Sequence, residues 1–169
     1  GAAQGMPNGP PPDGAVADPR LPHGSIEVTL LDGEGKPIPA TEVAMGVLVS
    51  SVSQGDRRSR STATTDAEGR ARFDKLETGL GVAYRVSVVR EGATFAAAPF
   101  NMPPSSGMRA QLHVYPVVRD VTQALVVTQA MFFAEVKDDR VQVQQAFRLY
   151  NFGKNAWVPD DLVLPLPAE

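Results

Sequence analysis

Residues 64–76, TTDAEGRARFDKL, decide how the rest of the sequence is interpreted, because they place one tight turn between two short segments. Gly69 can adopt the positive φ that a tight hairpin requires. The Asp66 side chain can accept hydrogen bonds from backbone N–H groups two residues further along. The flanking segments, TATT and RARF, are typical of strands. We therefore interpret residues 66–69 as a hairpin turn and not as the corner of a small-molecule site.

Further segments with period-two alternation lie on both sides of this hairpin. In residues 25–31, SIEVTLL, every second residue is apolar, which is typical of a strand buried on one side. The polar stretch 53–61, SQGDRRSRS, interrupts the pattern and predicts a solvated loop. Seven short strands with Gly, Pro and Asp corners predict an all-β sandwich. Besides 25–31 and the two hairpin strands, these are residues 41–52, 83–91, 93–100 and 109–118.

The sequence pattern changes after Arg119 and Asp120, where the predicted strands become longer. Residues 124–136 and 140–152 are long apolar-rich segments separated by a short charged corner, so we expect a long antiparallel hairpin over about 123–150. The tail that follows contains several prolines and predicts an edge strand or an extended arm. Residues 119–169 are too few for an ordinary core of their own. They should pack on the first domain, pair with another copy, or form the first part of a second β domain.

The first 23 residues contain many Pro and Gly and few large apolar side chains. Such a composition cannot offset the entropy of ordering, so residues 1–23 are predicted to be a flexible tether. A stiff Pro-rich spacer could hold a domain away from a membrane to which segments outside this sequence are anchored. The expected organisation is a tether over 1–23, a sandwich over 24–118 and a hairpin extension over 119–169.

Composition excludes several classes of function. The chain has 169 residues, of which 43% are hydrophobic, and its net charge of −3 gives no general attraction to nucleic acid. It contains no cysteine, which excludes disulfides, thiol nucleophiles and Cys-ligated metal centres. No apolar run approaches the length needed to cross a bilayer. We expect no cofactor, no metal and no nucleic-acid partner.

The hairpin motif and the strand YRVSV that follows it resemble the carboxypeptidase regulatory-like domains, which are prealbumin-like, or transthyretin-like, sandwiches. The resemblance covers about residues 24–117, and LGVA at 80–83 departs from it by lengthening one corner. It implies a Greek-key seven-stranded sandwich with a non-catalytic role, and the final residues resemble a β module that follows such domains in exported bacterial proteins. A periplasmic or cell-envelope location is therefore expected. The matching positions are Thr65, Asp66, Gly69, Phe73, Leu76, Gly79 and Tyr84, preceded by Gly35, Pro37 and Val43.

Catalytic and metal sites are not favoured by the motifs present. The pattern D-x-E-G occurs at residues 32–35 and 66–69, but neither copy has the further ligands of a calcium loop, so both are interpreted as turns. No G-x-S-x-G motif is present, and His113 lies in a predicted strand, where a polar-face imidazole is the ordinary interpretation. We expect the protein not to be an enzyme. A hydrolase would require a cleft that joins His113 to an acid and a hydroxyl.

Two groups of residues are candidates for ligand contact. Arg57, Arg58 and Arg60 form the one basic cluster, which could grip a phosphate or a carboxylate if it is not simply a solvated loop. The main expectation is a spacer and protein-interaction module that engages a partner or a second copy through edge strands or the 123–150 hairpin. The alternative is a carbohydrate- or peptide-binding module with an aromatic platform. Its candidate residues are Trp157, Tyr150, Phe152 and Tyr115.

Overall fold

The computed structural model describes residues 13–51 and 55–162. The chain is all-β and divides into two compact units, Gly1–Tyr115 and Pro116–Glu169. Within the described residues, the one helical element is the short 3-10 helix η1, and no helix is long and apolar enough to cross a membrane.

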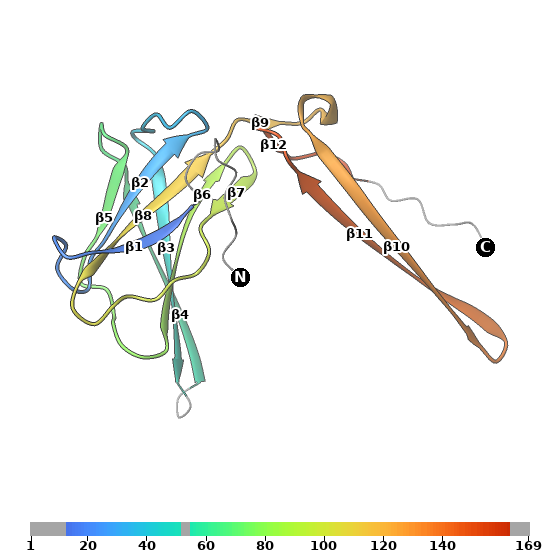
Figure 1. Cartoon of the computed structure of the whole chain (residues 1–169), viewed down its shortest axis with the longest axis horizontal. Coiled ribbons are helices and arrows are strands. Elements are labelled where there is room, and N and C mark those ends of the chain that lie inside the picture. The colour runs from blue at the N-terminus through green and yellow to red at the C-terminus, as the bar shows by residue number, and fades with distance from the viewer. Residues whose placement is uncertain (1–12, 52–54, 163–169) are drawn as a thin grey trace. The chain divides into compact units, whose positions relative to one another are not determined.

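The first unit consists of two four-stranded sheets (Figure 1). The first sheet has the strand order β1-β8-β2-β5, in which β2 runs parallel to β8 and the other pairs are antiparallel. The second sheet has the order β4-β3-β6-β7 and is antiparallel throughout. The strands are β1 (Gly14–Asp18), β2 (Ile26–Asp32), β3 (Glu42–Ser51), β4 (Gly55–Thr64), β5 (Arg70–Phe73), β6 (Val82–Arg90), β7 (Ala93–Ala96) and β8 (Gly107–Val114).

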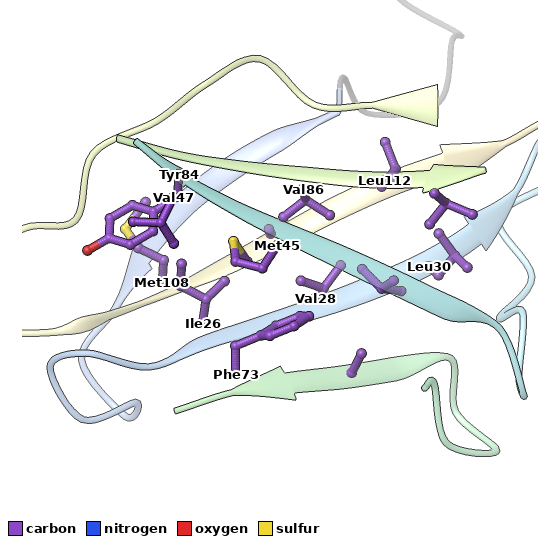
Figure 2. Close-up of a cluster of buried hydrophobic side chains, with 14 of the residues drawn as sticks. Ile26, Val28, Leu30, Met45, Val47, Phe73, Tyr84, Val86, Met108 and Leu112 are labelled. Carbon is purple, nitrogen blue, oxygen red and sulfur yellow. The ribbon is translucent and has the colours of Figure 1, made fainter. Parts of the chain in front are cut away.

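The core lies between the inner faces of these two sheets. Figure 2 shows side chains from β3 and β6 opposite those of β2 and β8, with Phe73 of β5 at one side. Every second residue of each central strand is buried, as the sequence pattern predicts. Burial of each such aliphatic side chain contributes about 1.5–3 kcal/mol to the free energy of unfolding. The Tyr84 ring is also buried, and its hydroxyl donates to the Glu77 carbonyl oxygen. The two sheets therefore form the expected sandwich.

The expected tether over residues 1–23 is wrong for its second half. Residues 1–12 lie outside the described part of the chain, but Gly14–Asp18 form β1, which pairs antiparallel with β8 along the edge of the first sheet. Its one buried residue is the charged Asp18, while the apolar Val16 and Ala17 are exposed, so no apolar alternation marks it as a strand. Hydrogen bonds and ion pairs at its two ends hold it instead. Asp13 bonds to His113, and Asp18 pairs with Arg109.

The solvated loop predicted over residues 53–61 is also wrong. From Gly55 onward this segment belongs to β4, which pairs with β3 along its whole length. Its side chains are exposed on both faces except near the end of the strand, so the sequence shows no period of two. Backbone pairing to β3, and not burial, makes this segment a strand. The sandwich therefore has eight described strands where the sequence predicts seven.

The second unit is built on the long hairpin that the sequence predicts (Figure 1). Its two strands pair antiparallel over twelve residues each. The expected domain boundary after residue 118 is shifted, because Pro116 interrupts the strand and Val117–Val118 pair with Ala156–Trp157 of this second unit. Residues 163–169 of the predicted arm lie outside the described part. The elements are β9 (Val117–Val118), η1 (Val121–Gln123), β10 (Val126–Lys137), β11 (Arg140–Asn151) and β12 (Ala156–Trp157).

Candidate functional site

The two D-x-E-G segments form turns of the same geometry. Asp66 Oδ1 accepts from the backbone N–H groups of Glu68 at 3.0 Å and Arg70 at 2.8 Å. Asp32 Oδ1 accepts from the corresponding N–H groups two and four residues ahead, at 2.8 and 2.9 Å. These N–H groups lower the pKa of both carboxyl groups. Each carboxylate is thus used by its own turn, and the described residues contain no group of acidic and histidine side chains able to hold a metal.

His113 lies in a buried contact at the edge of the first sheet. Its Nδ1 is 2.7 Å from Asp13 Oδ1, which also accepts from the His113 backbone N–H at 2.8 Å. The ring stacks near Tyr115 and is only 2% exposed. Within the described residues its Nε2 has no hydrogen-bond partner, so the ring is bonded to an acid but to no hydroxyl. His113 thus lies on the outer face of its strand, as predicted, but its ring is buried beside Asp13 and Tyr115.

The arginine cluster is divided by the alternation of β4. Arg57 points to one side of the sheet, and its Nη2 donates to both carboxylate oxygens of Glu77 at 2.6 Å. Arg58 and Arg60 do not share one face with Arg57, since successive side chains of a strand alternate. The register places Gly46 opposite Arg60 and also opposite Arg85 of β6, a residue far in sequence from the predicted cluster. The true cluster is therefore Arg58, Arg60 and Arg85.

The four candidate aromatic residues do not form one described platform. Tyr115 belongs to the first unit, where its ring lies 6.3 Å from Phe95. In the second unit Trp157 is half-buried and its Nε1 donates to the Arg119 carbonyl oxygen at 3.0 Å. Tyr150 and Phe152 stack with ring centroids 6.1 Å apart, and both are exposed. Only this last pair has the exposed, parallel rings that the platform requires.

The hairpin β10–β11 has two chemically different faces. Residues paired directly across an antiparallel ladder point to the same side. One side, here called the apolar face, carries no charged residue, and its polar members are Thr128, Gln145 and Asn151. Its other members are Val126, Ala130, Phe132, Ala134, Val136, Val141, Val143, Phe147 and Leu149.

The apolar face is exposed within the second unit. Phe132 is 64% exposed, Val136 79% and Val141 60%. Phe132 and Phe147 meet edge to face at 6.2 Å, so the two rings already form one patch. The opposite side, here called the charged face, carries Glu135, Lys137, Arg140 and Arg148 near the apolar Met131 and Phe133. The hairpin therefore has one face without charge and one face on which charged and apolar side chains are mixed.

The sequence predicts the hairpin but does not show which of its two faces lacks charge. Both strands contain apolar residues in both phases, so the pattern of a single strand does not show which side lacks charge. The register of Val126 with Asn151 down to Lys137 with Arg140 supplies that information. No family model matches the chain, and no curated protein matches it.

Proposed function

We propose that this protein is a non-catalytic β-sandwich module that associates with a second copy of itself through the apolar face of β10–β11. The observation that carries the proposal is an uncharged, exposed apolar face on a sheet of only two strands. A two-stranded hairpin alone is at best marginally stable in water, and burial of one face stabilises it. Contact with another surface is thus what the composition of this face favours.

A second copy is the occupant that the charges support. In a twofold contact each face meets its own equivalent, and a face without charges has no like-charge repulsion to overcome. Two strands of this length present a face about 40 Å long and about 10 Å wide. Two such faces together bury on the order of 1,000 Å², which is the lower range of specific interfaces. We therefore expect a dimer that dissociates on dilution.

The fold relationship and the location belong to the same proposal. The sheet orders β1-β8-β2-β5 and β4-β3-β6-β7 support a prealbumin-like sandwich of the carboxypeptidase regulatory-like type, with β1 at the edge of the first sheet. Such modules are non-catalytic partners, and the buried state of His113 supports a non-enzymatic role. An exported, envelope-associated location in a bacterium, periplasmic or held near a membrane by other segments, completes the proposal.

An alternative use of the second unit rests on Tyr150 and Phe152. Their stacked, exposed rings could contact a sugar ring or a peptide aromatic group. This function would not require self-association. A glycan-array signal that is lost on Phe152→Ala would favour it over the dimer.

Two neighbouring phenylalanines on opposite faces provide the test. Phe132 lies on the apolar face and Phe133 on the charged face. We expect light scattering of the full chain to show a dimer at high concentration, and Phe132→Asp to weaken the association by at least tenfold, because a carboxylate would be buried in the contact. Phe133→Asp, which introduces the same charge, should have a much smaller effect.

A monomer at millimolar concentration, or equal loss of association in the two variants, would contradict the proposal. Retention of the circular-dichroism spectrum by both variants is the control for folding. An unaffected Phe132→Asp dimer would place the contact elsewhere on the molecule.

A further inference from the structure

A second surface lies on the outer face of the sheet β4-β3-β6-β7. Met45 and Val47 of β3 are buried in the core, so Gly46 between them faces outward. Gly46 is paired with Arg60 on one side and with Arg85 on the other. Directly paired residues share a face, so the two arginines flank a position that has no side chain.

The missing side chain leaves a hollow of about 180 Å³ between the two arginines. Two hydroxyl side chains also line it, which gives this small space four donor groups. A larger hollow of about 390 Å³ shares Gly46 and Arg85 with it and is lined further by Arg58 and by the apolar Leu48 and Ala83. The smaller hollow is lined by Gly46, Arg60, Arg85, Ser87, Thr94 and Ala96.

Within the described part of the chain, no acidic side chain forms an ion pair with the arginines of this face. Six of the nine arginines in the first unit form ion pairs, at positions 20, 57, 70, 72, 90 and 109. Among the described residues, the three that form none are Arg58, Arg60 and Arg85. Glu42 and Asp56 lie on the same face near opposite ends of the strands, and neither lines either hollow. The unpaired cations are therefore gathered where the sheet is hollow.

We propose that this face binds a phosphate or sulfate monoester. Arg60 and Arg85, with the hydroxyls of Ser87 and Thr94, hold the tetrahedral oxyanion in the smaller hollow. Guanidinium groups suit this task because they donate two parallel hydrogen bonds to oxyanions. The carbon skeleton of the ester, such as a sugar ring, lies in the larger hollow, where Leu48 provides apolar contact.

The arrangement favours a monoester over an acidic peptide. The backbones of Arg60 and Arg85 lie about 10 Å apart across three strands, and both side chains line the smaller hollow, so they can act on one group. Phosphate and sulfate monoesters both present three tetrahedrally arranged oxygens to such a hollow, and the phosphate ester carries a charge of about −1.5 to −2, whereas a carboxylate has two oxygens. An extended acidic peptide would instead need a longer row of cations along one strand, and on this face β4 supplies only Arg58 and Arg60.

The test uses the full chain with glucose 6-phosphate and glucose 6-sulfate as probes, followed by backbone-amide NMR and calorimetry at low salt. We expect amide shifts at Gly46, Arg60 and Arg85, and binding at least tenfold tighter than that of glucose or inorganic phosphate. Arg85→Gln should weaken binding of at least one ester by about 10-fold or more, since a charge-assisted hydrogen bond is lost.

Two further variants separate a shaped site from general charge. Arg57→Gln removes the same charge from the same stretch of sequence but from the other side of β4, and it should leave the affinity unchanged. Gly46→Val keeps every charge and fills the floor of the hollow, so it should weaken binding as Arg85→Gln does. A Cβ at position 46 would lie 3.6 Å from the Arg85 carbonyl oxygen, an ordinary contact, so the strand should tolerate it.

Three results would overturn the proposal. The first is that Arg57→Gln and Arg85→Gln weaken the affinity for the esters equally. The second is that glucose or inorganic phosphate binds as tightly as both esters. The third is that hexaglutamate binds more tightly than either ester. Arg85→Lys serves as a second variant if Arg85→Gln loses its dispersed amide spectrum. It keeps the charge but not the bidentate geometry, and it should also weaken binding.

Discussion

Gly69 and Gly35 occupy equivalent places in the two D-x-E-G turns but have different surroundings. Both have positive φ, at 70° and 83°. A Cβ at position 69 would lie 2.7 Å from the Leu30 carbonyl oxygen, whereas one at position 35 would meet nothing within 4 Å. The turn at Gly69 is therefore packed against β2, whereas the Cβ position of Gly35 faces open space.

This difference predicts unequal effects of the same substitution. Gly35→Ala should lower the free energy of unfolding by about 1 kcal/mol, the cost of a left-handed backbone in a residue with a side chain. Gly69→Ala should cost about 3 kcal/mol or more, because the backbone of β2 must also move. Urea denaturation of the two variants measures the difference, and equal losses would show that the contact with Leu30 is unimportant.

At the scale of the element, β1 is an edge strand fixed mainly by polar groups. Asp18 is 5% exposed and accepts from the Arg20 side chain at 2.9 Å, from the Arg20 backbone N–H at 3.0 Å and from Arg109 of β8 at 3.0 Å. Hydrogen bonds from Arg20, followed by the charges of both arginines, lower the pKa of Asp18 from 3.8 to about 2. The strand is thus held by a carboxylate that must stay ionised.

The lowered pKa gives a direction for the dependence on pH. Because the folded state holds the ionised form, the contribution of Asp18 is present above pH 3.8 and is lost as the pH falls toward about 2. Asp18→Asn should lower Tm at neutral pH. The difference in Tm between this variant and the parent protein should become smaller as the pH falls from 3.8 to about 2. Glu34→Gln, which removes an exposed pair with Lys36, is the control and should change Tm little. A constant difference down to pH 2 would exclude this role.

The elements found from the sequence are those whose side chains are buried on one side. Alternation in β2, β3 and β6 follows from the core, so it is visible in the residues themselves. The strands β1 and β4 carry almost no buried side chains and depend on pairing with β8 and β3, which no local pattern shows. For the same reason, only part of the arginine site can be predicted from the sequence. Arg58 and Arg60 are neighbours in sequence, but Arg85 joins them only through the register of β6.

At the scale of the whole molecule, the two proposed surfaces belong to different units. The hollows lie on the first unit, which has a complete core between two sheets. The apolar face lies on the second unit, where no residue in the described range 116–162 is buried to the extent seen in that core. The two units should therefore differ in how their stability depends on contact with other molecules.

Hydrogen exchange at several protein concentrations tests this difference directly. If the apolar face is covered by a second copy, dilution below the dissociation constant should speed exchange in β10 and β11, because the hairpin then loses the burial that stabilises it. Exchange in β3 and β6 should stay constant, since their core lies within one chain. Phe132→Asp should make the hairpin exchange fast at every concentration, whereas Phe133→Asp should keep the dependence on concentration. Slow exchange of the hairpin in dilute solution would mean that its two strands are stable without a partner, which would contradict the proposed covering of the apolar face by a second copy.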